Sequence, residues 1–387
     1  MGGVQHSTIL LAKSLNKIES IDIKILIPKI GKMSSECDKF SITYDFYNRL
    51  DFFSTSISLF NDKIRIINPF SYIYNLFVII INAFSLKNIL SRNNVDIVLS
   101  KGLGSHFSCS LACKMMGKKV IWHLQDLISD RYFGFLHFII NHTANLFADF
   151  VICDGQLIKE NLRGYAYNNS KVIFNGVNVD ELKISDVSRE ATRNELKIPL
   201  DAYVIGNVAR ITSWKGQKYL LNAFIEYSKV NKKAFLLLVG SPLFDGQKYY
   251  KELQDIIKKN NLIKRVILPG YRLDLQNIFS SIDLFAYTSV EKDTTPLSLI
   301  SALSSGLPII VSNIPSLSEV ISCFENVKTF ECNDSKNIIL LLKEYEDKET
   351  RELHGAINRR CAKKYFDISI HTEQMLDVFL NLDNQLK

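Results

Sequence analysis

The stretch LFAYTSVEKDTTPLSLISALSSGLPIIVSNIPSLSEVI, residues 284–321, decides the fold. It predicts a short apolar strand at 284–287, a polar loop at 289–294, a helix and, after the turn at 306–308, a second buried strand at 309–311. A strand, a loop, a helix and a further strand in this order are the repeating unit of a parallel sheet wrapped by helices. The stretch therefore predicts an α/β fold.

The start of the helix in this stretch is the first candidate site. Thr295 is a natural N-cap, and Pro296 at the first helical position gives up an amide that would have no partner there. The remaining amides and the positive end of the helix dipole then face the loop, where an anion or a hydroxyl-rich ligand can bind. Asp293 stands just ahead, at the carboxyl end of a strand, where open α/β sheets bind their ligands.

The same alternation of strands and helices runs through the whole chain and predicts doubly wound parallel sheets. The expected strands are 23–27, 64–67, 96–99, 120–123, 150–153 and 172–174, then 204–208, 234–239, 266–268, 284–287 and 309–311. The expected helices are 7–16, 72–91, 105–116, 136–148, 217–230, 247–259, 273–280 and 296–304. A length of 387 residues predicts two domains.

The domain boundaries follow from composition. The charged stretch 180–199 is interpreted as the linker region, so we expect domains over 1–180 and 181–365, with a C-terminal helix in 366–387 packing back on the first domain. The Gly2-Gly3 turn arrives with no strand before it, which is unusual for a doubly wound domain. Either the first strand is missing because the chain is truncated or its start is misassigned, or the sheet edge is closed in another way.

Composition limits the functional classes. The chain is 47% hydrophobic and 22% charged, which is typical of a globular protein. Its net charge of +7 is concentrated in the first 180 residues, with 19 Lys and Arg against 14 Asp and Glu. This balance suits anionic phosphates or an anionic membrane surface and is too dilute to indicate nucleic acid. Seven scattered cysteines without metal-ligand spacing, and no signal peptide before Gly2, predict a reduced, cytoplasmic protein without a metal site.

The most membrane-like segment is 70–86, which carries no charged residue. Asn75 and Asn82 interrupt it, and it falls short of a full membrane span. We expect a buried helix packed on a sheet, and keep open a helix that also touches a bilayer surface.

Two cations follow the predicted strand 204–208. Arg210 and Lys215 lie five residues apart in a strand-to-helix turn, so both can face one crevice and neutralise a diphosphate. The alternative is a solvated loop with two surface charges. The loops at 240–242 and 270–272 end neighbouring strands, so that Gly240, Tyr271 and Arg272 are expected at the same sheet edge as Asp293.

His123 ends a buried strand of the first half. A histidine in this position is either a structural residue or a crevice-facing functional one, and the sequence favours neither. Asn175-Gly176 is interpreted as turn chemistry, and Glu319 as a helix cap or a surface acid.

Four motifs together resemble one large family: GGVQHS at 2–7, FNGVN at 174–178, VARITSWKGQ at 208–217 and DTTPLSLISALSSGLP at 293–308. The chain is similar to the retaining, nucleotide-sugar-dependent GT-B glycosyltransferases called group 1, which build bacterial capsule, lipopolysaccharide and exopolysaccharide. The resemblance implies two Rossmann-like domains facing a central cleft, with the acceptor-side domain first and the donor-binding domain second.

The resemblance also implies roles for single residues. Asp293 matches the first acid of an E-x7-E signature that contacts the transferred sugar, His123 resembles a histidine near the anomeric carbon, and Gly2 and Gly3 match a glycine loop near the diphosphate and acceptor. The donor-binding residues are then Arg210, Lys215, Gly240, Tyr271, Arg272, Thr294, Thr295, Pro296, Leu297 and Ser301. The chain departs from the family where Ser301 replaces the second acid and Gln5 a common Glu. Losing the charged hydrogen bond at Ser301 costs about 1.5–3 kcal/mol of nucleotide affinity if nothing replaces it.

The activity implied by the resemblance is transfer of a hexose from a UDP- or GDP-sugar to a glycan or lipid-linked glycan, with retention and without a metal or other cofactor. Such an enzyme is expected in the cytoplasm, with the inner face of the plasma membrane as a further expected partner. Two alternatives stay open: a sugar-nucleotide epimerase or sugar phosphorylase of the same fold, and a non-catalytic scaffold in a polysaccharide-assembly complex.

Overall fold

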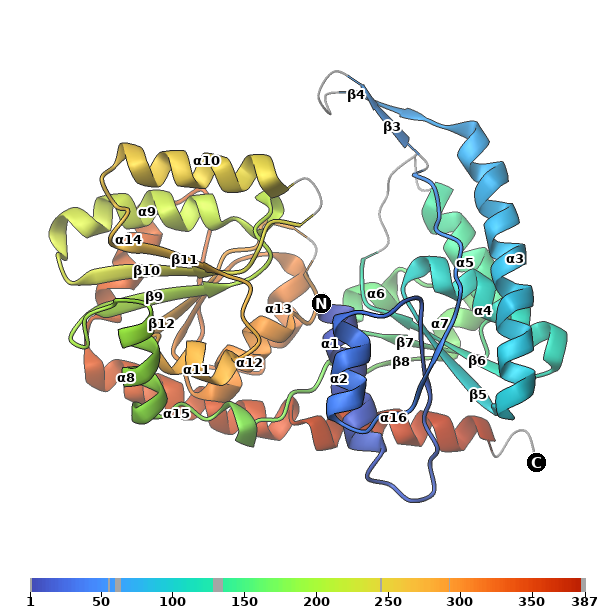
Figure 1. Cartoon of the computed structure of the whole chain (residues 1–387). Helices are drawn as coiled ribbons and strands as arrows, with labels where there is room; N and C mark the ends of the chain where they lie inside the picture. Colours follow the sequence, from blue (N-terminus) through green and yellow to red (C-terminus); the bar gives the residue numbers. More distant parts are fainter. Residues whose placement is uncertain are drawn as a thin grey trace. The chain divides into compact units, whose positions relative to one another are not determined.

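The computed structural model describes residues 2–54, 56–59, 64–127, 135–243, 246–291 and 293–383. The chain forms two compact units (Figure 1). Unit 1 comprises Met1–Phe174 and Thr372–Lys387, and unit 2 comprises Asn175–His371. From the sequence we expected the chain to pass between the two domains at 180/181 and again at 365/366.

Unit 2 contains one six-stranded parallel sheet in the order β11-β10-β9-β12-β13-β14. Its strands are β9 (Tyr203–Val208), β10 (Ala234–Val239), β11 (Val266–Gly270), β12 (Leu284–Tyr287), β13 (Ile309–Ser312) and β14 (Lys328–Phe330). The chain runs outward from β9 to β11 and then returns to the other side of β9 with β12. The order of the strands therefore reverses between β9 and β12, which is the point where doubly wound sheets bind ligands.

Helices cover both faces of this sheet, as Figure 1 shows. They are α8 (Asp186–Glu195), α9 (Gln217–Val230), α10 (Gly246–Lys259), α11 (Leu275–Ser280), α12 (Leu297–Ser305), α13 (Ser318–Ile321), α14 (Ser335–Glu344) and α15 (Lys348–Tyr365). The main core joins the sheet to α9, α10 and α14 through side chains such as Phe224, Leu236, Leu253 and Leu342. Every residue of β9, β10 and β12 is buried, because helices lie on both sides.

The prediction that 180–199 is a linker was wrong. The segment contains a 3-10 turn at Asp180–Leu182 and the helix α8. Arg193 on α8 is fully buried, and its Nη2 donates to Asp283 Oδ2 at 2.7 Å while its Nη1 donates to the Leu200 carbonyl at 2.9 Å. A charged segment that the sequence suggested to be solvated is thus part of unit 2. The buried carboxylate of Asp283 compensates the charge of Arg193.

Unit 1 is built around a four-stranded parallel sheet in the order β5-β6-β7-β8. These strands are β5 (Ile97–Lys101), β6 (Lys119–Leu124), β7 (Phe150–Cys153) and β8 (Ser170–Val172), and two further pairs are β1 (Ile25–Ile27) with β2 (Tyr44–Phe46) and β3 (Ser56–Leu59) with β4 (Ile64–Ile67). The predicted strand at 64–67 therefore exists, but it pairs antiparallel with β3 outside the parallel sheet. Among the residues described ahead of β1, α1 is the first element, and it begins at Gly3.

The helices of unit 1 enclose its sheet. They are α1 (Gly3–Leu15), α2 (Lys32–Lys39), α3 (Pro69–Asn93), α4 (Leu103–Met116), α5 (Phe135–Phe147), α6 (Gln156–Glu160), α7 (Gly164–Asn168) and the end of α16 (Ile368–Asp383). One cluster packs α1 and α16 against the sheet through Leu11, Ile121, Ile152 and Met375. Another packs α3, α4 and α5 against Trp122.

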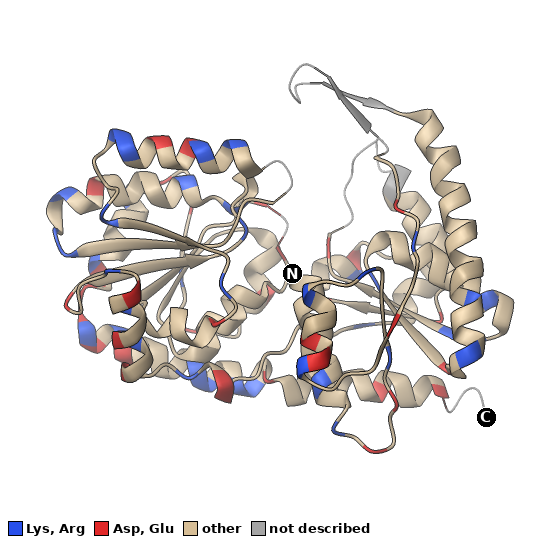
Figure 2. Cartoon of the chain, viewed as in Figure 1, with Lys and Arg blue, Asp and Glu red and all other residues tan. Residues whose placement is uncertain are grey.

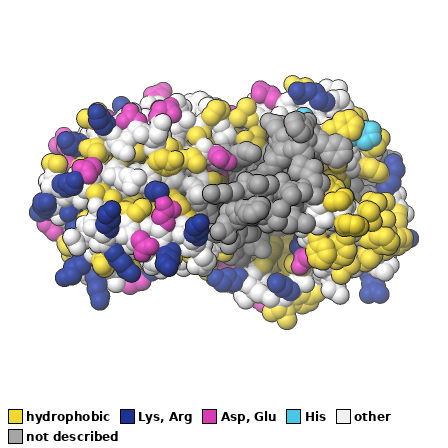
Figure 3. All heavy atoms as spheres, turned by 90° about the horizontal axis from the view of Figure 1, so that it is seen from above, with side chains coloured by type: hydrophobic (Ala, Val, Ile, Leu, Met, Phe, Trp, Pro, Cys, Tyr) yellow, Lys and Arg dark blue, Asp and Glu magenta, His cyan; other side chains and the backbone are white. Residues whose placement is uncertain are grey.

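The prediction that 70–86 forms a buried helix was right about the helix and wrong about its burial. α3 buries one side, which includes Val78, Ala83 and Leu86, while Phe70 is 79% and Phe77 63% exposed. In Figure 2 most of the α3 ribbon has neither the colour of Lys and Arg nor that of Asp and Glu, and Figure 3 shows apolar side chains gathered over this part of unit 1. Within the described part of the chain, α3 alone has the length and hydropathy of a membrane-crossing helix, with 28% of its most apolar window buried, which is weak evidence for a span.

Candidate functional site

The loops that follow β9 and β12 are joined to each other at the point where the strand order reverses. The Val290 amide donates to the Trp214 carbonyl at 2.9 Å, and Thr288 Oγ1 donates to the Lys215 carbonyl at 2.8 Å. Gln217 Nε2 donates to the Arg210 carbonyl at 2.8 Å and closes the first loop on itself. These bonds fix the predicted cations Arg210 and Lys215 beside the loop that carries Asp293.

Two glycines allow this close approach. Gly216 has φ +66°, and a Cβ there would lie 1.9 Å from the Thr288 carbonyl oxygen. Gly240, at the end of β10, has φ +148°, and a Cβ would lie 1.9 Å from the Ala209 carbonyl oxygen. Any side chain at either position would push apart the loops of neighbouring strands.

Lys215 and Asp293 form an ion pair at this edge of the sheet. Asp293 Oδ2 also accepts from the Tyr287 hydroxyl at 2.6 Å and from Ser289 Oγ, and Lys215 Nζ donates to the Tyr287 hydroxyl at 2.9 Å. Burial raises the pKa of Tyr287 well above its ordinary value, so its hydroxyl keeps its proton for Asp293. The donors from the described residues all reach Oδ2, which leaves Oδ1 to accept from a ligand hydroxyl.

This ion pair is buried but still reaches the surface. The side chains of Lys215 and Asp293 are 9% and 13% exposed. Two cations contact the Trp214 ring, with the Arg210 guanidinium 4.9 Å and the Lys215 ammonium 4.3 Å from its ring centre. The aromatic ring therefore holds two positive groups close together, an arrangement that suits a ligand with adjacent anionic groups.

The helix after Asp293 starts one residue later than predicted. α12 begins at Leu297, and its N-cap is Pro296 with φ −70° and ψ 117°, so the assignment of Thr295 as N-cap was wrong. Pro296 has an extended ψ, while its carbonyl accepts from the amides of Leu299 and Ile300 at 3.0 and 3.1 Å. The amides of the first turn still point toward the Asp293 loop.

The other predicted donor residues lie in unit 2 as well. Thr294 and Thr295 are buried, and Asn175 Nδ2 donates to the Thr295 carbonyl at 3.2 Å. The pair Asn175-Gly176, interpreted from the sequence as a turn, thus also holds this loop. Ser301 is 4% exposed on α12, one turn into the helix from Leu297.

Tyr271 and Arg272 follow β11, at the end of the sheet. Arg272 Nε and Nη2 each donate to Asp274 at 2.7 Å, and Nη2 also donates to Glu195 on α8 at 3.1 Å. Tyr271 is 38% exposed. The structure therefore uses Arg272 to connect this turn to α8, and contact of either residue with a nucleoside base remains a prediction.

His123 lies in unit 1, fully buried at the end of β6. Its Nε2 is 2.6 Å from Asp154 Oδ1, and its Nδ1 has no hydrogen-bond partner among the described residues. Burial lowers the pKa of His123. Burial alone would raise the pKa of Asp154, but the hydrogen bonds from His123 and Gln125 and the charge of Lys101 lower it overall. We therefore assign a neutral imidazole that donates from Nε2 to an ionised carboxylate.

Lys101, at the end of β5, completes this polar cluster of unit 1. Burial lowers the pKa of Lys101 to about 8, against the opposing effect of Asp154. Its Nζ donates to Ser7 Oγ at 3.4 Å, and Gln125 Nε2 donates to Ser7 Oγ at 3.3 Å and to Asp154 Oδ2 at 3.2 Å. Carboxyl ends of three adjacent strands thus supply Lys101, His123 and Asp154.

The predicted glycine loop stands at the start of α1. Gly2 is the N-cap, and its amide donates to Gln5 Oε1 at 3.0 Å. A Cβ on Gly2 or Gly3 would meet no atom within 4 Å, so there is open space around this turn. Ser7, one turn further, joins α1 to the polar cluster of unit 1.

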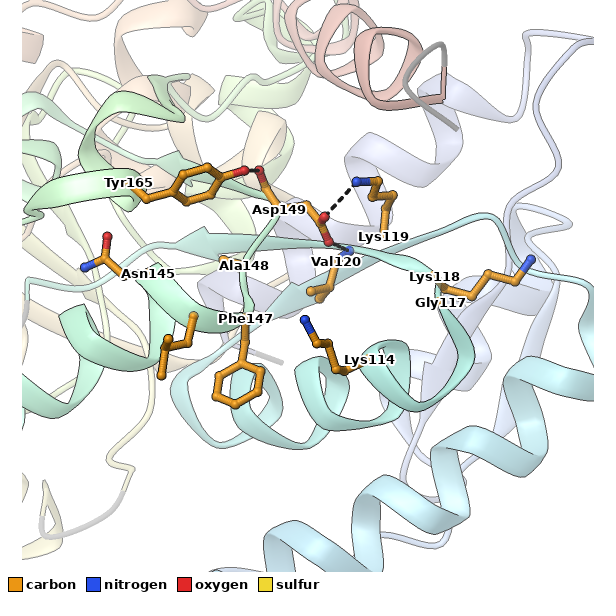
Figure 4. A pocket seen from close by; sticks show the side chains of 11 residues that line it. Lys114, Gly117, Lys118, Lys119, Val120, Asn145, Phe147, Ala148, Asp149 and Tyr165 are labelled. Atoms are coloured by element: carbon orange, nitrogen blue, oxygen red, sulfur yellow. Dashed lines mark hydrogen bonds and ion pairs between the residues drawn. The ribbon is translucent and has the colours of Figure 1, made fainter. Parts of the chain in front are cut away.

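A surface pocket of about 420 Å³ lies at the opposite edge of the sheet of unit 1 (Figure 4). Lys119 opens β6 and pairs with Asp149, just before β7, at 2.9 Å, while Asp149 Oδ2 accepts from the Val120 amide at 2.8 Å. Lys119, Asp149 and the Val120 amide thus satisfy one another at the amino ends of the strands, away from His123. No three His, Cys, Asp or Glu residues within the described ranges are grouped to hold a metal ion.

Sequence reasoning missed the partners of the predicted residues. Tyr287, Ser289 and Trp214 surround the Lys215–Asp293 pair, and Asp154 holds His123. Asp154 directly follows a predicted strand, so the rule that pointed to Asp293 would also have found it. The partners of Lys215 could not be read from spacing, because they come from a different strand.

Comparison with known proteins agrees with this architecture. The sequence model of Glycosyltransferase Family 4 matches residues 1–181, and that of Glycosyl transferases group 1 matches residues 188–363. Together they match nearly the whole chain. The chain belongs to the group 1 glycosyltransferases, as its motifs predicted.

The relatives whose activity is named are only distantly similar to this chain. The chain is 25% identical over 217 residues to UDP-Gal:alpha-D-GlcNAc-diphosphoundecaprenol alpha-1,3-galactosyltransferase of Escherichia coli, covering 54% of each chain. It is also 25% identical over 195 residues to alpha-monoglucosyldiacylglycerol synthase of Streptococcus pneumoniae, covering 49% of this chain and 41% of that one. The chain thus spans about half the length of the curated relatives it matches.

Solved structures establish the fold. Anabaena Alr3699/HepE in complex with UDP and glucose superposes with a TM-score of 0.80 at 20% identity, covering 98% of this chain and 96% of that one. Sucrose-phosphate synthase from Thermosynechococcus elongatus superposes with a TM-score of 0.74 at 17% identity, covering 99% and 94%. The fold is therefore GT-B, with two Rossmann-like units.

Proposed function

We propose that this protein is a retaining glycosyltransferase that moves a hexose from a nucleoside-diphosphate sugar to a glycan or lipid-linked glycan acceptor in the synthesis of a bacterial surface polysaccharide. The observation that carries the proposal is the Lys215–Asp293 pair, placed with Arg210 where the strand order of unit 2 reverses. The Escherichia coli relative, a galactosyltransferase whose name includes a UDP-sugar and a diphosphoundecaprenol-linked acceptor, supports UDP over GDP and a lipid-linked acceptor.

Arg210, Lys215 and the α12 amides supply the electrostatics of the reaction. When the C1–O bond to the diphosphate breaks, the electron pair moves to the departing phosphate oxygen. Two cations on the Trp214 ring and the first-turn amides of α12 would stabilise that charge without reorganising. No step in this scheme requires a metal, and the proposed reaction is metal-independent.

Asp293 would orient the transferred sugar. Its Oδ2 is held by Lys215, Tyr287 and Ser289, so Oδ1 can accept from a sugar hydroxyl in a fixed position. The acceptor oxygen then bonds to C1 on the face that the diphosphate leaves, and the acceptor proton passes to the leaving phosphate oxygen. Retention of configuration follows from attack on that face.

Donor identity can be tested by calorimetric titration of the whole chain with UDP-, GDP-, ADP- and CDP-sugars. We expect UDP-sugars to bind most tightly, with no effect of a chelator. The anomeric configuration of the transfer product, read by proton NMR, is expected to match that of the donor, and an inverted product would contradict retention. Binding of a UDP-sugar without transfer to any acceptor would favour the non-catalytic scaffold, and epimerised donor would favour an epimerase.

The proposed location is the cytoplasm. All seven cysteines are free thiols, and Cys37, Cys109, Cys113 and Cys153 are buried in unit 1. Thiols in this number are typical of a reducing compartment. Fractionation of cells that express a tagged chain tests this, and recovery from the periplasm would contradict it.

A further inference from the structure

We propose that the exposed face of α3 docks on an anionic lipid bilayer, with the helix lying along the membrane surface. The face is a stripe at helical spacing, formed by Phe70, Ile73, Phe77, Ile81 and Phe84, which are 79%, 63%, 63%, 47% and 54% exposed. The fourteen helical steps from Phe70 to Phe84 make the stripe about 21 Å long. A continuous exposed apolar patch of this kind marks an interaction site (Figure 3).

The polar residues of α3 do not interrupt the stripe. Asn75 exchanges hydrogen bonds with the backbone N and O of Phe53, both at 2.9 Å. Asn82, two turns later, does the same with Leu50 at 2.9 and 3.1 Å. Both amides are therefore satisfied by a chain segment of unit 1 on another side of the helix.

The same contacts decide that the helix lies on a membrane and does not cross it. Val78, Asn82 and Leu86 are buried where α3 packs against its neighbours in unit 1. Drawing α3 into the hydrocarbon would expose these contacts and break the bonds of Asn75 and Asn82. The exposed side of α3, which carries the stripe, is the side available to lipid.

The charge at one end of α3 favours lipid over a second copy of the chain. Lys87 and Arg92 follow the stripe along α3, and Lys114 stands at the end of α4, which touches α3 where Ser91 Oγ meets Met116 Sδ at 3.8 Å. Neither α3 nor α4 contains an acidic residue, so a second copy of these two helices would offer these cations no counter-charge (Figure 2). An anionic bilayer supplies this counter-charge through its headgroups and also offers an apolar layer to the stripe. Amphipathic helices on membrane surfaces use both.

Vesicle co-sedimentation of the whole chain tests the proposal, with vesicles of phosphatidylcholine alone and of equal parts phosphatidylcholine and phosphatidylglycerol. We expect binding to the anionic vesicles that falls with salt. Ile73→Ser with Phe77→Ser should lower the partition coefficient at least about 10-fold, because it removes the centre of the stripe. Lys87→Gln with Arg92→Gln should lower binding to the anionic vesicles about 5-fold or more and leave binding to the neutral ones unchanged.

A matched control comes from unit 2. Val230→Ser with Leu340→Ser removes two side chains of similar exposure, 70% and 65%, and should bind vesicles like the unaltered chain. Equal binding by the α3 variants and this control would overturn the proposal. It would also be overturned if the chain ignored vesicles and formed a dimer that Ile73→Ser with Phe77→Ser dissociates, since the occupant would then be a second copy. Because vesicle binding needs no donor, these outcomes are independent of glycosyl transfer.

Discussion

The two units each place a hydrogen-bonded pair of polar side chains at the carboxyl edge of a parallel sheet, but the pairs differ in how far they reach the surface. In unit 2 the side chains of Lys215 and Asp293 are 9% and 13% exposed, with Arg210 close by. In unit 1 the side chains of His123 and Asp154 are 0% and 2% exposed. The carboxyl edge of the sheet thus carries a partly exposed cluster in unit 2, which can touch a ligand. In unit 1 it carries an enclosed cluster, which organises the unit itself.

This difference in exposure bears on the role of His123. The resemblance implied a histidine near the anomeric carbon, whereas the imidazole here is enclosed and donates to a buried carboxylate. Its position is consistent with a positioning role in which Asp154 fixes the tautomer and Lys101 compensates the charge. Contact of His123 with a substrate remains a prediction.

The largest expected effect in this comparison is on the stability of unit 1. Asp154→Ala leaves the buried His123 and the half-buried Lys101 without their carboxylate, and should lower the free energy of unfolding by about 3–5 kcal/mol. Denaturant unfolding measures this, with Asp51→Asn, an 85% exposed acid of the same unit, as the control. Calorimetry should show UDP affinity unchanged in folded Asp154→Asn, and loss of UDP affinity there would remove the distinction between the two clusters.

The next effect is on catalysis by unit 2. Lys215→Met should lower the transfer rate about 100- to 1,000-fold, because a preorganised cation is lost from the leaving phosphate. Lys215→Arg keeps the charge and should recover part of the rate. The neighbouring Lys218 pairs with Glu252 at the surface, so Lys218→Met is the matched control and should transfer normally. Steady-state rates that do not separate Lys215→Met from Lys218→Met would refute the role of the cluster.

A smaller effect is expected at the edge of the same cluster. Arg210→Ala removes one charge-assisted contact and should weaken UDP binding about 10- to 100-fold. Uridine has no phosphate, so its affinity should stay unchanged in the same calorimetric series. Equal losses for UDP and uridine would show that Arg210 supports the fold of the loop and not the diphosphate.

The smallest effect is a pH dependence of stability that belongs to unit 1. Lys101 has a pKa of about 8 in the folded chain, below the 10.5 of an unburied lysine. Between these values the unfolded chain binds more protons at Lys101, so this residue contributes a rise of the free energy of unfolding with pH of up to about 1 kcal/mol per unit. The buried thiols of Cys109, Cys113 and Cys153, with a pKa of about 12, oppose that rise equally in the wild type and in Lys101→Met. Urea unfolding from pH 7.5 to 9.5 should therefore show a more positive pH slope in the wild type than in Lys101→Met, and parallel profiles would contradict it.

The sequence was most informative where burial is continuous. The strands of unit 2 at 234–239 and 284–287 and the helix at 217–230 have the predicted bounds, because apolar runs between turn residues leave little freedom. The helix α8 was not predicted, because its charged residues suggested a solvated linker. In the structure one of them, Arg193, is buried and pairs with Asp283. The exposed face of α3 was only the less favoured alternative, because a helix that is apolar all round is predicted to be buried.

The candidate site was predicted as separate loops and not as a set of contacts. Strand ends pointed to Lys215 and Asp293, since parallel strands bring their carboxyl ends to one edge. That Tyr287 and Ser289 share one carboxylate oxygen with Lys215 depends on the register of β9 against β12, which pairs Leu284 with Ile205. Local spacing does not encode that register.

The central claim is that the Lys215–Asp293 cluster of unit 2 binds the diphosphate of a nucleotide sugar. The most direct test is calorimetric titration of UDP into the whole chain and into its Lys215→Met and Lys218→Met variants. We predict that Lys215→Met weakens UDP binding at least about 10-fold and that Lys218→Met changes it less than about twofold. Equal UDP affinity in all three proteins would contradict the claim.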